Sequence, residues 1–461
     1  MQIPFSPPIA AIATAQAPGA IGIVWISGTG AAEIADRIFC PVSGARLSDS
    51  PGYRAHYGQL TDGSGTFDDG VATVFRAPRS YTGEDCVELS CHGGVYLTRR
   101  VLRAALDAGA RMAQPGEFTR RAFLNGKMSL TSAESVMQRI GAQGALAARA
   151  AQAGAQDVLA RRIDGIRTAL TDAAAHLAAW ADFPDEAVPD VTDGELHARL
   201  ADADRALTQL LDAFDAGRIL RDGIDTVILG SPNVGKSTLM NVLAGCERSI
   251  VTGVPGTTRD VVEESVRLGE IVLRLADTAG LRDTDDPVER IGVHRARTRL
   301  ETAGLVLAVF DGAAPLTDTD RALLDELASH PERPTVAVIN KSDLPEQVES
   351  EEIRARIPRT VRLSARQQIG VDALADAVAD ALGTSLLRPD EGMLFTERQR
   401  DSAYRAREAV RSADSALRSG MTFDAVTVDV ESAVGALAEL TGESVSESVV
   451  DAVFSQFCVG K

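Results

Sequence analysis

The sequence predicts a multidomain protein of mixed class, in which two α/β segments and a helical domain share 461 residues. A chain of this length exceeds what one hydrophobic core normally fills, so about two to four domains are expected. Short apolar runs between Gly, Pro and Ser turns fill two separate regions, which is typical of α/β structure. The other regions are rich in Ala, Leu and Arg, which favours helices.

Four segments follow in order along the chain. Residues 1–122 are predicted to form a compact α/β domain, with strands at IAAIAT, IGIVWISG, GVATVF and CVELSCHGG and a helix near 95–108. Residues 123–221 are predicted to form the first part of the helical domain, 222–383 a second α/β block, and 384–461 the second helical part. Because helical stretches flank this block, we expect it to be inserted into the helical domain.

Charge and cysteine content narrow the class of protein. The net charge of −18 argues against indiscriminate binding to nucleic acid, since phosphate is repelled over most of such a surface. A local basic cluster is consistent either with a binding patch or with a solvated helix face, and it comprises Arg99, Arg100, Arg103, Arg111, Arg120, Arg121 and Lys127. Five scattered cysteines, no long apolar run and no basic N-terminal leader predict a cytoplasmic protein with reduced thiols and no membrane partner.

The second α/β block carries a phosphate-binding loop. An apolar strand at 225–229 leads into Gly230-x-x-x-x-Gly235-Lys236-Ser237, and a helix pattern follows. Backbone N–H groups of such a loop surround phosphate oxygens, and the helix N-terminus adds partial positive charge. Lys236 would reach the β- and γ-phosphates, while the Ser237 hydroxyl would ligate Mg²⁺. Asn233 is consistent either with a ligand for a monovalent cation or with simple turn chemistry.

Further motifs in the same block identify the nucleotide. The Asp343 carboxylate in Asn340-Lys341-Ser342-Asp343 can accept from N1–H and N2–H₂ of guanine, whereas adenine would leave it unpaired. The remaining candidates are Thr258 for Mg²⁺, Asp277, Thr278, Ala279 and Gly280 for Mg²⁺ and the γ-phosphate, and Ser364, Ala365 and Arg366 for guanine O6. All these elements stand in order at strand ends, where open α/β sheets bind ligands. The block is therefore predicted to bind guanine nucleotides.

The residue after Asp277-Thr278-Ala279-Gly280 is Leu281. In Ras-like switches a glutamine stands there and orients the attacking water, which a leucine cannot do. Catalysis is therefore expected to use an extra positive charge near the phosphates and a carboxylate further along the segment. The candidates for that carboxylate are Asp283, Asp285, Asp286 and Glu289.

Two cysteine patterns in the sequence have more than one interpretation. Cys86-x-x-x-x-Cys91-His92 lacks a second Cys/His pair at ligand spacing, so a strand-to-helix turn is favoured over a metal site. The C-terminus FSQFCVGK places Cys458 as a prenylation box would, yet Lys461 occupies the last position and the preceding stretch is acidic. A lipid anchor is therefore not expected, and the tail is a candidate for a functional position.

The motifs SPNVGKST, PGTTRD, DTAGLRDTDDPVERIGVHRA, PGEFTRRAFLNGKMSL and FCVGK together resemble the MnmE (TrmE) family of tRNA wobble-uridine modification GTPases. The resemblance spans the whole chain. It implies an N-terminal α/β folate-binding domain that forms a homodimer, a helical bundle domain, and an inserted Ras-like P-loop G domain with a mostly parallel sheet.

The resemblance also implies the reaction. A potassium-activated GTPase of this kind works with an FAD-containing partner of the MnmG type, in a heterotetramer or larger complex. Together they install an aminomethyl or carboxymethylaminomethyl group at C5 of the wobble uridine of certain tRNAs. The one-carbon unit comes from 5,10-methylene- or 5-formyl-tetrahydrofolate, and FAD belongs to the partner.

Site residues carry over by matching position. The resemblance implies K⁺ ligation by Asn233, Thr252, Val254 and Thr257, and Mg²⁺ ligation by Ser237 and Thr258. It gives Glu289 the role of orienting the catalytic water. The expected GTP contacts also include Val234, Gly235, Lys236, Thr238, Gly253, Pro255 and Gly256.

Folate contacts are implied for Trp25, Glu88, Lys127 and Lys461, with Cys458 close to them as a catalytic candidate. Trp25 is a departure, because the family usually has an arginine there. An indole can stack on a pterin but cannot make the charge-assisted hydrogen bonds of a guanidinium.

An alternative is a regulatory GTPase of ribosome assembly, which would also lack the catalytic glutamine. Such a protein is expected to carry an RNA-binding appendix in place of the PGEFTRRAFLNGK block.

Overall fold

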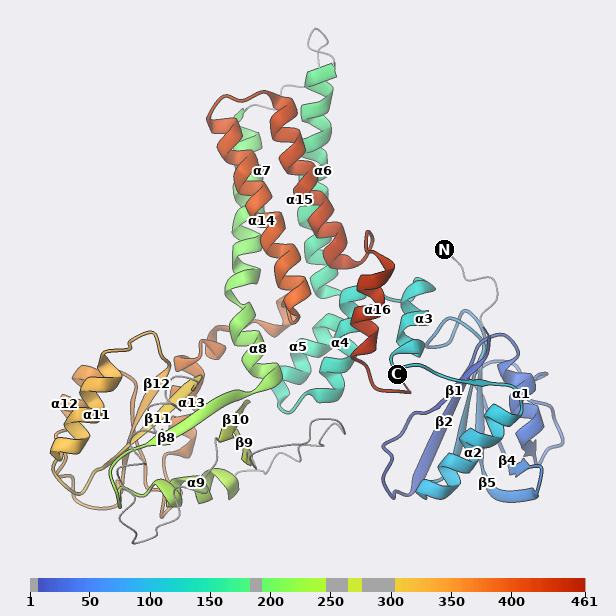
Figure 1. Cartoon of the computed structure of the whole chain (residues 1–461), viewed down its shortest axis with the longest axis horizontal. Helices are drawn as coiled ribbons and strands as arrows, with labels where there is room; N and C mark the ends of the chain where they lie inside the picture. The colour runs from blue at the N-terminus through green and yellow to red at the C-terminus, as the bar shows by residue number, and fades with distance from the viewer. Residues whose placement is uncertain (1–6, 183–192, 246–263, 276–302, 461) are drawn as a thin grey trace. The chain divides into compact units, whose positions relative to one another are not determined.

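A computed structural model describes residues 7–182, 193–245, 264–275 and 303–460 (Figure 1). The chain divides into two compact units. Unit 1 comprises Met1–Met137, Ala155–Val191 and Ser415–Lys461, and unit 2 comprises Gln138–Gly154 and Thr192–Asp414. Within the described ranges, no helix is both long and apolar enough to span a membrane.

Unit 1 contains a seven-stranded sheet in the order β3-β4-β5-β6-β2-β1-β7. Its neighbouring strands are antiparallel except for β1 and β7, which run parallel. The strands are β1 (Ile9–Ile12), β2 (Ile21–Ser27), β3 (Phe39–Pro41), β4 (Arg54–Asp62), β5 (Gly65–Phe75), β6 (Cys86–His92) and β7 (Arg111–Met112). The structure therefore has a strand in each of the four segments predicted from the sequence.

Successive side chains of β2 point to opposite faces of this sheet, and each face is covered by its own core. Val24 and Ile26 point into a core formed with α1 (Ala31–Ile38) and α2 (Val95–Asp107). The intervening Trp25 points to the other face, because successive strand residues alternate. There it joins a second small core around Phe118 of α3 (Glu117–Leu124), with Tyr81 at its edge.

The helices of unit 1 join distant parts of the sequence. Besides α1 to α3, they include α4 (Leu130–Gly141, which ends in unit 2), α6 (Val158–Asp182), α15 (Phe423–Thr441) and α16 (Glu447–Ser455). α6 and α15 lie side by side (Figure 1), and Arg167 of α6 forms an ion pair with Glu443, just after the end of α15. α16 packs on α3, where a Cβ at Gly116 would lie 2.6 Å from the Phe454 carbonyl oxygen. The glycine at 116, with φ of 66°, therefore permits the close approach of the C-terminal helix.

Unit 2 contains a six-stranded sheet in the order β13-β12-β11-β8-β10-β9, parallel except for the β9–β10 hairpin. The strands are β8 (Ile224–Leu229), β9 (Glu264–Leu268), β10 (Ile271–Leu275), β11 (Leu305–Asp311), β12 (Thr335–Asn340) and β13 (Thr360–Arg362). The predicted mostly parallel sheet is thus confirmed.

Both faces of this sheet are buried, which explains why β11 reads as the continuous apolar run LVLAVF. Leu305, Leu307 and Val309 face a core shared with α9 (Lys236–Gly245) and α13 (Val371–Ala381). Val306, Ala308 and Phe310 face a separate core under α11 (Asp318–Ala328) and α12 (Ser350–Arg356). The alternation places helices on both sides of the sheet (Figure 1).

The remaining elements of unit 2 are α5 (Ala145–Ala155, which ends in unit 1), α7 (Asp193–Asp212), α8 (Phe214–Asp222), the 3₁₀ turns η2 (Thr384–Leu386) and η3 (Pro389–Glu391), and most of α14 (Glu397–Arg418). α7 and α14 are joined by Asp204–Arg411 and His197–Asp414 pairs.

The two ends of the α/β block lie side by side. α8 leads directly into β8, and its Arg221 guanidinium donates to the carbonyl of Phe395, which follows the block. Gly217 of α8 comes so close to Met393 that a Cβ there would lie 2.9 Å from the methionine Cε. Neighbouring ends are what an inserted domain requires.

The β9–β10 hairpin is bonded to the start of α5 and to the residues just before it. The Glu270 carboxylate accepts a hydrogen bond from the Leu146 backbone N–H at 2.7 Å, in the first turn of α5. Arg267 Nη1 also donates to the Gln143 carbonyl at 3.4 Å. The hairpin therefore caps a helix of the neighbouring helical segment within unit 2.

Candidate functional site

The phosphate-binding loop runs from the end of β8 to the start of α9, and space as well as backbone conformation requires its two glycines. Gly230 has φ of 148° and Gly235 has φ of 98°. A Cβ at Gly230 would lie 2.2 Å from the Val309 carbonyl oxygen, and one at Gly235 would lie 2.2 Å from Asn340 Nδ2. Asn233 adopts φ of 63°, a conformation that asparagine tolerates better than most residues.

Lys236 begins α9 and folds over the loop. Its Nζ donates to the carbonyl oxygens of Gly230 at 2.9 Å and Ser231 at 2.8 Å. The Ser237 and Thr238 side chains are exposed in the first turn of the helix. An ammonium group, a helix N-terminus and accessible hydroxyls therefore meet at one place, and this donor set suits a polyphosphate with its metal ion.

The residues predicted to recognise the base lie beside the loop. Asn340 Nδ2 donates to the Val234 carbonyl at 2.9 Å, and Asn340 Oδ1 accepts from the Ala365 N–H at 3.0 Å. The buried Asn340 side chain thus ties the phosphate-binding loop to the segment that carries Ser364, Ala365 and Arg366. Three sequence segments come together because β8, β12 and β13 are parallel strands of one sheet and end at the same edge.

Asp343 is exposed and its carboxylate is oriented by a neighbour. The Ser364 hydroxyl donates to Asp343 Oδ1 at 2.6 Å, and this hydrogen bond lowers the pKa of the Asp343 carboxyl below its ordinary value. The carboxylate is therefore ionised at neutral pH and acts only as an acceptor, as recognition of guanine requires. Lys341, at φ of 62°, donates to Asp311 at 2.6 Å, at the end of the neighbouring strand β11.

Several predicted residues lie outside the described part of the chain, and their roles stay predictions. They are Thr252, Gly253, Val254, Pro255, Gly256, Thr257, Thr258, Asp277, Thr278, Ala279, Gly280, Glu289 and Lys461.

In unit 1, Trp25 and Glu88 are direct cross-strand partners on the face opposite α1 and α2. The Trp25 ring packs edge-on against Phe118 at a centroid distance of 5.5 Å and lies tilted against Tyr81 at 5.7 Å. Lys127 is exposed, and its Nζ donates to the Pro78 carbonyl at 2.9 Å, in the same loop as Tyr81. The loop at 78–82 thus connects the surroundings of Trp25 with those of Lys127.

Buried charges that sequence reasoning missed hold this loop in place. The guanidinium of Arg121, which is 4% exposed, bonds Glu84 at 3.0 Å and Glu117 at 2.9 Å. Glu84 also accepts from the Ser27 hydroxyl at 2.9 Å, at the end of β2. The i, i+4 spacing of Glu117 and Arg121 is the one sequence signal for part of this network.

The basic cluster of the sequence is mostly neutralised by ion pairs. Arg100 pairs with Asp62, Arg103 with Asp107, Arg111 with Glu117, and Arg120 with Asp451. Together with the paired Arg121, these contacts favour a structural role over an open phosphate-binding patch.

The C-terminal tail is fixed against the N-terminal sheet. The Cys458 carbonyl accepts from the Gly116 N–H at 3.4 Å, and the Cys458 side chain is exposed. Gly460 is buried with φ of 102°, and a Cβ there would lie 2.2 Å from the Ile12 carbonyl oxygen. Ile12 follows Ala11, which pairs with Trp25 across β1 and β2. Gly460 therefore lies one strand away from Trp25.

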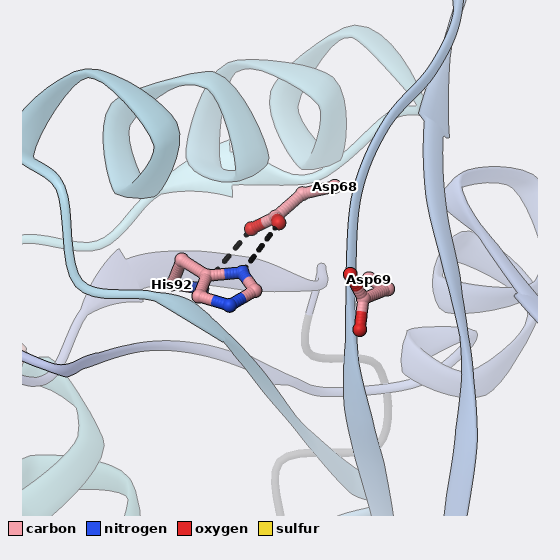
Figure 2. Close-up of side chains that lie close together, drawn as sticks. All are labelled: Asp68, Asp69 and His92. Atoms are coloured by element: carbon pink, nitrogen blue, oxygen red, sulfur yellow. Dashed lines mark hydrogen bonds and ion pairs between the residues drawn. The ribbon is translucent and has the colours of Figure 1, made fainter.

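In the part of the chain that the structure describes, the ligand atoms of Cys86, Cys91 and His92 do not come together in one group. Both thiols are buried, and burial raises the pKa of each of them. His92 instead forms a surface pair with Asp68 through Nδ1 at 2.7 Å and its backbone N–H at 3.0 Å (Figure 2). Asp69 is close to both, but its carboxylate accepts from the Tyr57 hydroxyl at 2.8 Å.

The sheet of unit 2 is mostly parallel and covered on both faces, and Asn340 joins its phosphate-binding loop to the base-recognition segment, residues 364–366. These features define a guanine-nucleotide-binding P-loop protein. Comparison with known proteins narrows this class. The protein-family model of the MnmE helical domain matches residues 130–458. The family model of the GTP-binding protein TrmE N-terminus matches residues 8–127.

Curated relatives match this sequence over nearly the whole chain. The tRNA modification GTPase MnmE of Symbiobacterium thermophilum is 45% identical, with 98% of this chain and 99% of that protein covered. The protein of the same name from Heliobacterium modesticaldum is 41% identical at the same coverage, and that from Clostridioides difficile is 36% identical. The chain belongs to the MnmE family of tRNA modification GTPases.

Two solved structures of other proteins resemble part of the chain. The G domain of the FeoB iron transporter of T. maritima is 22% identical, covers 34% of this chain and 98% of its own, and has a TM-score of 0.26. Era of Aquifex aeolicus bound to GDP.AlF4⁻ is 25% identical, with 40% and 66% covered and a TM-score of 0.27. The family assignment rests on the sequence relatives and family models.

Asp343→Asn is expected to exchange guanine for xanthine specificity. The amide would turn a donor toward N1–H and N2–H₂ of guanine but could donate to the 2-oxo group of xanthine. Affinity for GDP should fall about 100-fold or more, and affinity for xanthosine diphosphate should rise. Fluorescence titration with both nucleotides measures this. Asp372→Asn, an exposed carboxylate on α13, is the matched control and should change neither affinity. Unchanged GDP binding in Asp343→Asn would contradict the assignment.

Proposed function

We propose that this protein is a potassium-activated GTPase that acts in modification of the wobble uridine of tRNA. The observation that supports it most is the junction of the phosphate-binding loop with the base-recognition segment through Asn340. The family assignment favours tRNA modification over the alternative of ribosome assembly.

In the proposed hydrolysis, Lys236 leaves the carbonyls of Gly230 and Ser231 and pairs with phosphate oxygens. Ser237, exposed at the start of α9, would ligate Mg²⁺ together with Thr258. The Asn233 amide oxygen would bind K⁺ together with Thr252, Val254 and Thr257. A monovalent cation there would supply the positive charge that an arginine provides in other GTPases, and Glu289 would orient the water.

Asn233 fits this role by chemistry and position. Its side chain is exposed in the middle of the loop. An amide oxygen is a hard ligand of the kind that K⁺ prefers. Its positive φ does not itself require asparagine, because glycine adopts the same conformation more easily. A glycine variant can therefore remove the ligand without straining the loop.

GTP hydrolysis is expected to be faster in KCl than in NaCl at equal ionic strength. Asn233→Gly should abolish most of this difference, whereas Asn233→Asp, which keeps an oxygen ligand, should retain part of it. Asn241→Ala removes an exposed amide from α9 and serves as the matched control. Phosphate release assays in both salts provide the measurement. Equal wild-type rates in the two salts would refute potassium activation.

For the tRNA reaction, we propose that unit 1 binds 5,10-methylene- or 5-formyl-tetrahydrofolate. Glu88, Lys127, Lys461 and Trp25 would contact the folate, which supplies a one-carbon unit when bound. The adjacency of Trp25 and Glu88 and the fixed tail that carries Cys458 support this site. Residues 123–221 and 384–461 would form the helical domain around a G domain at 222–383. The protein would work in the cytoplasm as a homodimer, dimerised through residues 1–122, with an FAD-containing MnmG-type partner.

Trp25→Arg is expected to tighten folate binding. A guanidinium at this position can donate charge-assisted hydrogen bonds to the pterin, and Glu88 on the neighbouring strand would hold it in place. The gain should be about fivefold or more in Kd. Calorimetric titration with 5-formyl-tetrahydrofolate measures it. Trp25→Phe, which keeps ring packing on Phe118 and adds no donor, is the control, and an arginine variant with no gain over wild type would count against the assigned contact.

A further inference from the structure

The phosphate-binding loop has a side-chain anchor that none of its sequence motifs indicates. Ser231 occupies the first of the four variable positions of the loop, and its hydroxyl donates to Asp320 Oδ1 at 2.6 Å. Asp320 belongs to α11, which packs on the opposite face of the sheet from α9. The anchor therefore links the loop to a helix 89 residues further along the chain.

Asp320 is buried, and hydrogen bonds fix its carboxylate. It is 6% exposed, and its second oxygen accepts from the Thr317 N–H at 2.9 Å and the Thr317 hydroxyl at 2.7 Å. Thr317 in turn accepts from the Asp320 N–H, so the two residues form a capping box at the start of α11. One carboxylate thus serves two elements: Oδ2 caps the helix and Oδ1 holds the loop.

The backbone of the anchored residue also contacts Lys236. The Ser231 carbonyl accepts from Lys236 Nζ at 2.8 Å, so the side chain and the carbonyl of Ser231 are both engaged. Pro232, which follows Ser231, fixes its own φ and stiffens the next step of the loop. A shift of Ser231 would therefore displace the N–H groups of the loop and the starting position of Lys236 together.

We propose that Asp320 is a positioning residue for nucleotide binding, which holds the phosphate-binding loop in its receptive conformation through Ser231. The inference rests on the proposed GTP site. The loop N–H groups surround the α- and β-phosphates, which GDP and GTP share. The anchor therefore contributes equally to the affinity for both nucleotides and little to the rate of the chemical step.

Ser231→Ala tests this directly. The variant leaves a buried carboxylate oxygen without a donor, so the loop is released from α11. The Kd for GDP and for a non-hydrolysable GTP analogue should each rise about five- to tenfold, while kcat at saturating GTP stays within about twofold. Ser231→Thr retains the hydroxyl and should restore wild-type affinity.

Thr317→Ala is the matched control. It removes the Thr317 hydroxyl, which donates to Asp320 Oδ2 and accepts from the Asp320 N–H, but leaves the bond between Asp320 Oδ1 and Ser231, so it should lower thermal stability without changing nucleotide affinity. Equal Kd values in Ser231→Ala and wild type, or the same rise in both alanine variants, would show that Asp320 serves only the helix. Failure of the wild type to bind GDP would instead overturn the proposed site itself. Circular dichroism of each variant confirms that it is folded.

Discussion

The nucleotide site depends on one buried carboxamide, that of Asn340. Its two ends are used in opposite senses, as donor to the Val234 carbonyl and as acceptor from the Ala365 N–H. Asn340 is 3% exposed, so either group left unpaired would cost free energy of desolvation. Its Nδ2 also occupies the space that a side chain at Gly235 would need. The shape of the phosphate-binding loop and the position of the base-recognition segment are therefore set together.

Much of this site could be predicted from the sequence because its chemistry stands at strand ends. An apolar strand, two glycines and Lys236 predicted the loop, and the order of Asn340, Asp343 and Ser364 predicted the edge of a parallel sheet. The contact between Ser231 and Asp320 could not be predicted in this way. It joins two ordinary polar residues at no characteristic spacing, and only the packing of α11 beside the loop brings them together.

In the N-terminal region, too, the sequence predicted the strands but not the contacts between residues distant in sequence. Its predicted strands are present, because alternation along β2 and β6 signals two covered faces. The cluster of arginines was not interpretable from composition alone, since partners such as Asp62 and Asp451 are distant in sequence. Composition likewise indicated helices without indicating their neighbours. α6, α15 and α16 belong to the unit of the N-terminal sheet, while α7 and α8 belong to that of the parallel sheet.

The affinity of Asn340→Asp for GDP tests the account most directly. Aspartate keeps an acceptor for the Ala365 N–H but replaces the donor to Val234 with a charge that repels that carbonyl. Asn125→Asp removes the same kind of bond, to the Thr82 carbonyl at 2.8 Å, from unit 1 and is the matched control. The account predicts that Asn340→Asp binds GDP at least about tenfold more weakly while Asn125→Asp binds it normally. Wild-type affinity in Asn340→Asp would contradict the role assigned to this side chain.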